Sequence, residues 1–354
     1  MAGHTHAVTI VDVAREAGVS KSSAARVLAG RGSASTTTRR RVLDAAERLG
    51  YRPNALAKAM ISGTSNTLAI VIPDVASPFF AAVVRGATDA AHAAGFEVLL
   101  GNTDNDSDIQ SRAIDVLRQK RVDGFVIAPV LEDEPVAVRS LVDDDIPVVM
   151  VDRRMPALAD VPLVSIDHIA ASRSAVEHLI DLGHRRIAIV TEAAGARGGL
   201  LGADADAQAL PPSHQRLLGY IQALDAHGIA VDPDLVLESA YDPDSARASV
   251  AAALATTDFT ALYCTDSVLT LGAYMHIVDD EIPLPTAFSF LGFDDQQWTT
   301  LVRPAVTVVD QPRYRLGAAA ANLVIARIRD LTGVPTDLRL EAQLITRAST
   351  SPPA

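Results

Sequence analysis

The sequence has few of the features that cross-link a protein or anchor it in a membrane. Its 354 residues include one cysteine, Cys264, which excludes a disulfide framework and a thiolate metal site. No run of 18 apolar residues occurs, and the N-terminus lacks the basic and apolar regions of a signal peptide. We therefore expect a cytoplasmic protein that is neither exported nor inserted in a membrane.

Catalytic and cofactor motifs are also missing. The glycines within residues 193–213 are not followed by Gly-Lys-Ser/Thr, and they lack the spacing of a dinucleotide site. No Ser-His-Asp or Cys-His arrangement can be argued. Five histidines lack metal-ligand spacing: His4, His6, His168, His178 and His184. The sequence predicts no enzyme, no cofactor and no metal.

What the chain does have is an uneven charge. Residues 1–63 hold ten basic and four acidic residues, a net charge of +6, so the total of −12 leaves −18 on the remainder. With 49% hydrophobic and 21% charged residues the chain is globular. A basic head on an acidic body favours a polyanion as partner of the head, and a solvated helical surface is the alternative.

The head has the pattern of a helix-turn-helix. Thr9 caps a first helix that Gly18 ends, and Ser20 caps a second helix that runs to about Leu28. The second helix presents Lys21, Ser22 and Arg26 on one outer face.

A third helix, predicted from Thr38 to Leu49, closes the small core of the head. Its apolar residues are Val42, Ala45, Ala46 and Leu49.

Residues 51–63 join the head to the body. Pro53 suits a first helical position, good helix formers follow, and Gly63 ends the segment. A helix of under three turns is marginal in water, so it forms only against a partner. This segment is therefore a candidate switch.

From Asn66 onward, short apolar runs alternate with helix-length segments, which predicts an α/β fold with doubly wound parallel sheets in two lobes. The predicted buried strands are 68–72, 96–100, 124–128, 147–151, 163–166, 187–190, 235–237, 261–263, 288–292 and 306–309.

Polar and aromatic residues follow several of these strands, at the edge where open parallel sheets bind ligands. Carboxylates, an arginine and flat aromatic faces suit a polyhydroxylated ligand. The alternatives are a core role for one Phe and turn-capping for the Asp residues. The residues are Asp74, Ser77, Phe79, Phe80, Asp152, Arg153, Asp294, Asp295 and Gln311.

Residues 9–54 carry Val-Asp-Val-Ala-Arg-Glu-Ala-Gly-Val-Ser-Lys, then Arg-Val-Leu, then Glu-Arg-Leu-Gly-Tyr-Arg-Pro-Asn. This ordered set resembles the lactose-repressor/galactose-repressor (LacI-type) family of bacterial transcription regulators. The resemblance implies a helix-turn-helix head (1–50), a hinge helix and linker (51–64), a two-lobed periplasmic-binding-protein-like sensor (65–347) and a tail (348–354). It also implies lobe crossings near 163–166, 292–296 and 310–331.

The resemblance implies that a homodimer binds double-stranded, palindromic operator DNA and responds to a small sugar or sugar-derived effector. The second helix would enter the major groove and the hinge helix the minor groove. The DNA-binding residues would be Thr9, Ser20, Lys21, Ser22, Ser23, Arg26, Arg31, Asn54, Leu56, Ala57 and Met60. Ala25 replaces the usual Ser, and Met60 stands at the position of the wedge between base steps, for which an unbranched apolar side chain is suited.

For the sensor, the resemblance implies a cleft lined by Ser77, Phe79, Phe80, Asp152, Arg153, His214, Arg216, Thr265, Asp294, Trp298 and Gln311. Ser77, His214 and Thr265 depart from the Asn, Arg and Asn common in sugar binders, so the ligand is not read like simple ribose. Trp298 either stacks on a sugar or fills the lobe junction. Residues 193–213 form a longer loop than the family has, either a lid or a disordered insertion. The tail has no heptads for a tetramerising coiled coil.

Two other classes compete with this interpretation. A solute-binding protein without DNA function is opposed by the basic head and the missing signal peptide. An enzyme on a Rossmann-like sheet is opposed by the missing glycine fingerprint.

The hinge hypothesis gives a first prediction. Leu56 and Met60 are four residues apart and share one helix face, so Met60 can fill an opened base step. We expect Met60→Ala to reduce operator affinity and DNA bending without changing ligand affinity, and Met60→Leu to be tolerated. Fluorescence transfer across a labelled operator measures the bend. A lower melting temperature with an unchanged bend would show that Met60 only packs against its own sensor.

Overall fold

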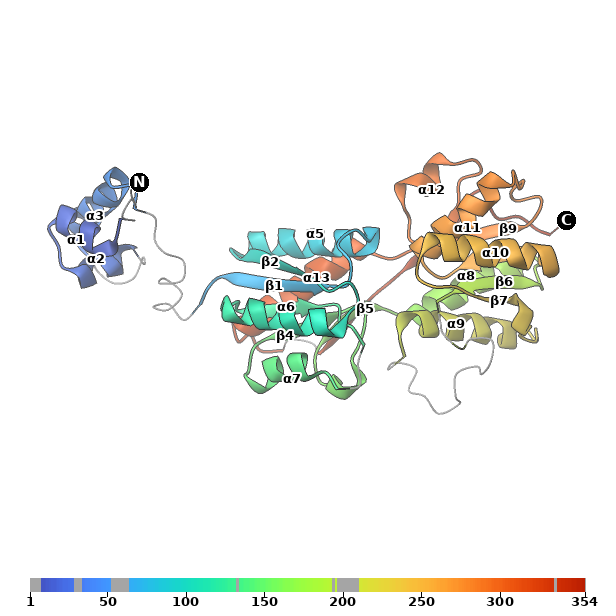
Figure 1. Cartoon of the computed structure of the whole chain (residues 1–354), viewed down its shortest axis with the longest axis horizontal. Coiled ribbons are helices and arrows are strands. Elements are labelled where there is room, and N and C mark those ends of the chain that lie inside the picture. The colour runs from blue at the N-terminus through green and yellow to red at the C-terminus, as the bar shows by residue number, and fades with distance from the viewer. Residues whose placement is uncertain are drawn as a thin grey trace, which may run out of the picture. The chain divides into compact units, whose positions relative to one another are not determined.

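The computed structural model describes residues 8–28, 34–51, 64–131, 134–192, 195, 210–333 and 336–353. The chain divides into two compact units, Met1–Asn66 and Thr67–Ala354 (Figure 1). Each unit is described by itself. Several predicted features lie outside the described residues: the hinge residues Asn54, Leu56, Ala57 and Met60, together with Arg31, His4 and His6. Of the predicted 193–213 loop, the residues 193–194 and 196–209 also lie outside them.

The first unit contains the predicted helix-turn-helix, α1 (Ile10–Ala17) and α2 (Lys21–Leu28). Gly18 ends α1 in the left-handed conformation, φ 61°, where glycine has no steric penalty. The Ser20 hydroxyl accepts the Ser23 amide at 3.1 Å, which caps α2. A small core holds the helices together: Val13, Ala14, Ala17, Ala24, Val27, Val42, Ala45 and Ala46.

The third helix, α3 (Thr36–Arg48), begins two residues before the predicted Thr38. The cause is Ser35, whose hydroxyl accepts the backbone N–H of Thr38 at 3.2 Å and thereby caps the helix earlier. Leu49 is partly buried against the core, as expected.

The second unit has two six-stranded sheets, which confirms the two-lobed α/β prediction. The first lobe has the order β11-β5-β4-β3-β1-β2 and the second β12-β10-β9-β8-β6-β7, so the same topology occurs twice. All neighbouring strands are parallel except β10 and β12. The first-lobe strands are β1 (Thr67–Ile72), β2 (Glu97–Asn102), β3 (Gly124–Ile127), β4 (Val148–Val151), β5 (Leu163–Ile166) and β11 (Asp337–Leu340). The second-lobe strands are β6 (Ile187–Thr191), β7 (Val236–Glu238), β8 (Ala261–Cys264), β9 (Ser289–Phe293), β10 (Thr307–Asp310) and β12 (Gln343–Ile345).

Three details of the strand prediction were wrong. The strand at 96–100 is not buried: β2 is an edge strand, with Leu99 and Leu100 about two-fifths exposed at 38% and 43%. β11 and β12 were missed because their alternating or partial burial gives no apolar run. Most other strand boundaries differ from the prediction by a residue or so.

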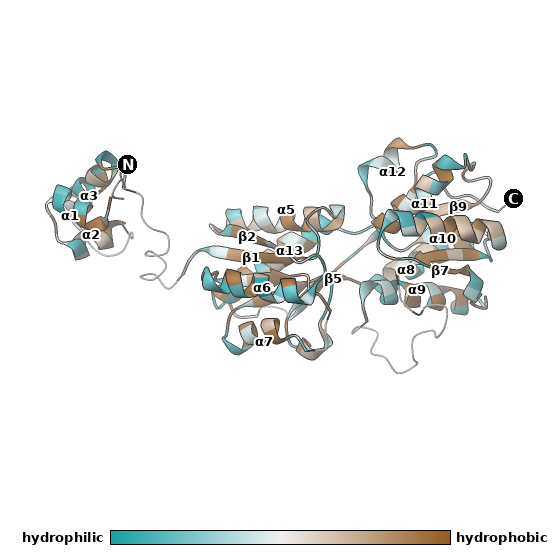
Figure 2. Cartoon of the chain, viewed as in Figure 1, coloured by the Kyte–Doolittle hydropathy of each residue, from teal (hydrophilic) through white to brown (hydrophobic). Residues whose placement is uncertain are grey.

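Helices flank both sheets, and Figure 2 shows apolar residues along the strands with polar residues on helix surfaces such as that of α6. The first lobe has α5 (Pro78–Ala93), α6 (Ser107–Gln119), α7 (Val136–Asp143), the 3₁₀ turn Pro156–Leu158 and α13 (Arg313–Ile328). The second has α8 (His168–Asp181), α9 (Pro212–Ala226), the 3₁₀ turn Pro233–Leu235, α10 (Pro243–Thr256), α11 (Ser267–Asp279) and α12 (Gln297–Leu301).

The chain passes between the lobes three times, at 166–168, 310–313 and 340–343. The first crossing directly follows the predicted 163–166, and the second is the beginning of the predicted 310–331. The segment 292–296 does not cross, because it joins β9 to α12 within the second lobe. The third crossing was missed together with the two strands that flank it.

The C-terminal segment is part of the second lobe rather than a separate tail. The Phe290 amide donates to the Ser349 carbonyl at 2.8 Å, and Ser349 is fully buried. His184, also buried, contacts the Ser351 carbonyl through Nε2 at 2.9 Å. Residues 349–351 therefore extend the packing of β9.

Helices α5 and α13 approach each other closely through two glycines. A Cβ on Gly86 would lie 1.9 Å from the Tyr314 carbonyl oxygen, and one on Gly317 would lie 1.8 Å from the Val83 carbonyl oxygen. Only glycine allows this reciprocal contact. It fixes the start of α13, just after the second crossing, against α5.

No helix in the described ranges is long and apolar enough to span a membrane.

Gly317→Ala tests this contact. We expect it to lower the free energy of unfolding by about 1 to 3 kcal/mol, because the methyl group has no room without a backbone shift. Asn322→Ala, an exposed position on the same helix, is the control and should be neutral or slightly stabilising. Urea unfolding measures both, and equal stability of Gly317→Ala and the wild type would show that the helices separate freely.

Candidate functional site

The first candidate site is the exposed face of α2. Lys21, Ser22 and Arg26 are exposed, whereas Val27 on the opposite face is buried. The Arg26 Nε donates to the Ser22 carbonyl at 3.4 Å, which leaves the rest of the guanidinium outward. The predicted residues Thr9 and Ser20 are also exposed, and Ser23 is partly exposed. This face is cationic and rich in hydrogen-bond donors.

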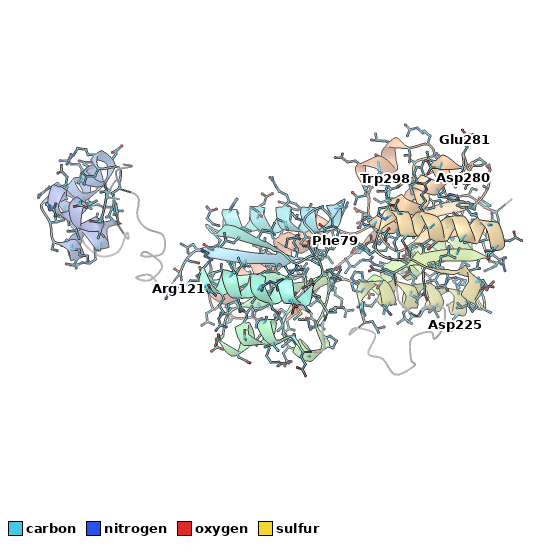
Figure 3. The ribbon with its side chains drawn as sticks, in the orientation of Figure 1. Phe79, Arg121, Asp225, Asp280, Glu281 and Trp298 are labelled. Atoms are coloured by element: carbon cyan, nitrogen blue, oxygen red, sulfur yellow. The ribbon has the colours of Figure 1, made fainter. Side chains whose placement is uncertain are left out.

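The second candidate site is a cavity of about 330 Å³ in the second unit, within the range of small-molecule sites. Residues of both lobes line it: Phe79, Phe80, Asn105, Val130, Leu131, Asp152, Arg153, Glu192, Pro211, Pro212, Ser213, His214, Arg216, Tyr241, Asp266 and Gln311. Figure 3 labels Phe79 at the edge of the first lobe that faces the second.

Most of the residues predicted for the cleft are in this lining. They are Phe79, Phe80, Asp152, Arg153, His214, Arg216 and Gln311. They come from the start of α5, the end of β4, the start of α9 and the end of β10. The strand-end argument therefore places side chains from both lobes around one cavity.

The other four predicted residues do not line the cavity. Ser77, Thr265 and Asp294 are buried behind it, and the Thr265 hydroxyl donates to the Val190 carbonyl at 3.0 Å. Trp298 is partly buried against the second-lobe core, with its ring centroid 5.1 Å from that of Tyr274. The sequence predicted either a sugar contact or a role at the lobe junction, whereas this packing lies within the second lobe.

Several lining residues were missed. Glu192 directly follows β6, and Asp266 follows β8 by one residue, so the strand-end argument applied to them as well. Tyr241 and Asn105 lie in loops after β7 and β2, where no apolar pattern marks their orientation. Pro211 to Ser213 begin α9 at the end of the long loop.

On the first-lobe wall, Asp152 and Arg153 form a pair. Asp152 has a positive φ of 69°, a conformation that Asp tolerates better than most residues. Arg153 Nε lies 3.6 Å from Asp152 Oδ2, and its Nη1 donates to Asn105 Oδ1 at 2.8 Å. Burial raises the pKa of Asp152, and the charges of Arg153 and Arg216 act against that rise.

A polar chain links this wall to the second lobe. The Arg216 Nε donates to His168 Nδ1 at 3.3 Å, and His168 Nε2 lies 3.7 Å from Asp152 Oδ1. Burial and the charge of Arg216 hold the pKa of His168 well below its usual value. His168 is therefore neutral. Because Nδ1 accepts from Arg216, the proton is on Nε2, which forms no hydrogen bond within the described part of the chain although it lies 3.7 Å from Asp152 Oδ1.

Arg216 is held by several second-lobe groups. Its Nη1 donates to the Thr265 carbonyl at 2.7 Å and lies 3.7 Å from Asp266 Oδ2. Its guanidinium carbon lies 4.2 Å from the centroid of the Phe293 ring, a cation–π distance. The guanidinium is thus fixed in a single orientation.

Asp294 and Gln311 form a buried pair beneath the cavity. The Gln311 Nε2 donates to Asp294 Oδ1 at 3.0 Å. Within the described part of the chain, Asp294 Oδ2 and Gln311 Oε1 have no hydrogen-bond partner. Burial, and secondly the charge of Asp266, raise the pKa of Asp294 to about 6. Asp294 also has a positive φ, 64°.

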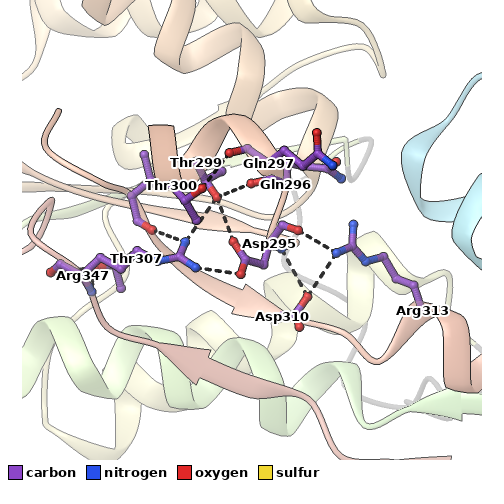
Figure 4. A network of polar contacts seen from close by, with 10 residues as sticks. Asp295, Gln296, Gln297, Thr299, Thr300, Thr307, Asp310, Arg313 and Arg347 are labelled. Atoms are coloured by element: carbon purple, nitrogen blue, oxygen red, sulfur yellow. Dashed lines mark hydrogen bonds and ion pairs between the residues drawn. The ribbon is translucent and has the colours of Figure 1, made fainter. Parts of the chain in front are cut away.

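A polar network joins the residues next to this pair in the chain, at the ends of β9 and β10 (Figure 4). Asp295 Oδ2 accepts from Arg347 at 2.7 Å and its Oδ1 from the Thr299 hydroxyl at 2.9 Å. Arg313 donates from Nη2 to the Asp295 carbonyl at 2.7 Å and to Asp310 Oδ1 at 3.3 Å. Burial alone would raise the pKa of Asp295, but the Arg347 and Thr299 hydrogen bonds lower it. The second crossing is therefore tied to β9 and to the C-terminal segment.

The described ranges contain no group of three His, Cys, Asp or Glu side chains arranged to hold a metal ion. The site is thus described by its hydrogen-bonding groups and charges.

Comparison with known proteins matches both units. Residues 9–54 match the family "Bacterial regulatory proteins, lacI family", and residues 65–348 match "Periplasmic binding proteins and sugar binding domain of LacI family". Catabolite control protein A of Priestia megaterium is 33% identical over 347 residues, which cover 97% of this chain and 99% of that protein.

Two solved structures are similar over nearly the whole length. A transcriptional regulator CelR–cellobiose complex has 28% identity and a TM-score of 0.70, covering 97% of this chain and 100% of that one. A lac repressor dimer bound to operator and an anti-inducer has 22% identity and a TM-score of 0.82, covering 98% and 100%. The second similarity supports the fold.

The raised pKa of Asp294 predicts a pH-dependent stability. The folded state binds the proton more tightly, so the stability that the neutral form has at low pH is lost as the pH rises through about 6, by up to about 3 kcal/mol. Asn tolerates the same positive φ and stays neutral. We expect Asp294→Asn to be more stable than the wild type at about pH 7.5, with a smaller difference at about pH 5.

Urea unfolding at the two pH values measures this difference, with Asp225→Asn at an exposed position as the control. A difference between Asp294→Asn and the wild type that does not change with pH would contradict an uncompensated buried carboxylate.

Proposed function

The chain belongs to the LacI family of bacterial regulatory proteins, and from this membership we propose that it acts as a repressor, whose homodimer binds a palindromic operator and responds to a sugar or sugar-derived effector. The chain is a ligand-responsive, DNA-binding transcriptional regulator, as its family is.

The exposed face of α2 supports DNA contact. Lys21, Ser22 and Arg26 point away from the core, and Arg26 can form two parallel hydrogen bonds to a guanine edge in the major groove. The surrounding head carries a net charge of +6, which provides the salt-dependent attraction to phosphates. The proposed contacts at Arg31, Asn54, Leu56, Ala57 and Met60 stay predictions.

The cavity supports an effector that bridges the lobes. The first lobe contributes Asp152 and Arg153 to the lining. The second lobe contributes Arg216 and Asp266, and the second crossing contributes Gln311. A ligand that contacts both groups stabilises one relative arrangement of the lobes over others, which is the requirement for a ligand-driven switch. The similar regulator whose structure was solved as a cellobiose complex supports a sugar as the ligand.

Exposed apolar side chains support a homodimer. Leu99 and Leu100 lie on the edge strand β2, and Leu271 and Val278 lie on α11, all between 38% and 56% exposed. Covering them would remove apolar surface from water in both lobes. We propose a cytoplasmic, non-enzymatic homodimer without a cofactor.

Arg26→Ala tests the DNA site. We expect operator affinity to fall by about 1 to 3 kcal/mol, as for the loss of one bidentate base contact, with a smaller effect on unrelated DNA. Arg112→Ala removes an exposed arginine from α6 in the second unit and is the control for the loss of charge. Gel shifts at matched salt measure both.

An unchanged operator affinity of Arg26→Ala would remove Arg26 from the site. The alternative, a solute-binding protein without DNA function, predicts that the wild type itself gives no salt-dependent shift with promoter DNA.

A further inference from the structure

One hydrogen-bond acceptor in the cavity lining has no partner in the described part of the chain. Gln311 lines the cavity and is only 2% exposed, yet its Oε1 accepts no hydrogen bond within the described part of the chain. Asp294 Oδ2, directly behind Gln311, is likewise without a partner there. A buried acceptor without a partner costs about 1 to 3 kcal/mol, so the site favours a ligand that donates.

The charges in the lining are also unequal. Three carboxylates, Asp152, Glu192 and Asp266, stand against two guanidinium groups. Arg153 lies 3.6 Å from Asp152 and Arg216 lies 3.7 Å from Asp266, so each guanidinium is already beside a carboxylate. Among the described residues no salt bridge balances Glu192. The described lining therefore carries one net negative charge.

Glu192 is in an unfavourable environment when it is ionised. Burial raises the pKa of Glu192, and the nearby charge of Asp266 raises it further, more than Arg153 and Arg216 lower it. A phosphate or carboxylate placed here would add to this repulsion. A cation would relieve it and pair with a partly desolvated carboxylate.

We propose that the effector is a hydroxyl-rich ligand with a protonated amine, an amino sugar, whose ammonium group lies against Glu192 and Asp266 and whose hydroxyl donates to Gln311 Oε1. This inference rests on the proposed function and specifies the class of its effector. It separates this cleft from one that reads phosphorylated sugars through arginine, because both guanidinium groups of the described lining already lie beside carboxylates.

The test uses the full-length protein and isothermal titration calorimetry at about pH 7.5. The probes are D-glucosamine, D-galactosamine and D-mannosamine, each compared with its parent hexose, its N-acetyl derivative and the hexose 6-phosphate. For at least one of the three hexoses, we expect the amino sugar to bind at least about tenfold more tightly than the parent hexose, the N-acetyl derivative and the 6-phosphate.

Glu192→Gln removes the charge and keeps the shape. It should weaken binding of the amine at least about tenfold while changing the affinity for the parent hexose by less than about threefold. Glu281→Gln, which removes an exposed carboxylate on the far side of the second lobe (Figure 3), should change neither. Circular dichroism melting confirms that the variants are folded.

Several results would overturn the proposal: tightest binding by a hexose, an N-acetyl derivative or a 6-phosphate, no binding by any of the three amines, or wild-type amine affinity in Glu192→Gln. Binding of a 6-phosphate that also changes operator affinity would reject the amine and leave ligand regulation standing. A wild type that does not bind operator would instead reject the proposed function.

Discussion

The contact that most constrains the sensor is the polar chain from Asp152 through His168 to Arg216. His168 begins α8 immediately after the first crossing, so its ring is fixed at the point where the chain enters the second lobe. One side faces a carboxylate of the first lobe and the other accepts from a guanidinium of the second. Because His168 and Arg216 both belong to the second lobe, a rotation of one lobe relative to the other must change the distance between His168 and Asp152. Since all three groups are buried, such a change has a large electrostatic effect.

The second crossing is constrained differently, by backbone contact and by the network around Asp295. Arg313 ties the first turn of α13 to the Asp295 carbonyl, and Gly317, one turn later, packs against the backbone of α5. Phe79 and Phe80, which line the cavity, are in the first turn of that same α5. The two helices also meet at their C-terminal ends, where Arg329 donates to the Ala94 carbonyl, so they run in the same direction. A ligand that contacts the aromatic pair and Gln311 therefore acts on the N-terminal end of one rigid helix pair. Such a pair moves as a body, which is how small shifts at a site become lobe rotations.

The fold was largely predictable because its signals are local. Apolar runs such as that of β3 and β4, fully buried on both faces, cannot be mistaken for helix surfaces. β11 and β12 have no such signal: their place in the sheets is decided by the third crossing, which is a long-range property. In the cavity, Asp152 and Gln311 were found from their places just after strands, whereas Glu192 was missed although it directly follows β6. Tyr241 was missed because only tertiary structure turns its loop toward Asp266 and Glu192. Trp298 was predicted to line the cleft because it lies near a strand end, but its side chain packs against the second-lobe core instead.

The acidic groups of the cleft explain why a binding site can weaken the protein that carries it. Asp294 and Glu192 both have raised pKa values, chiefly through burial, so each destabilises the folded state when it is ionised at neutral pH. A well-packed apolar replacement would be more stable but would bind no polar ligand. A ligand that pairs with Glu192, which lines the cavity, recovers the part of this free energy that belongs to Glu192, and does so only in the arrangement where both lobes contact the ligand. The free energy recovered on binding therefore increases the ligand's preference for the lobe arrangement in which both lobes contact it over the arrangement in which they do not. That preference sets the upper limit on how far any effector can shift the population between them.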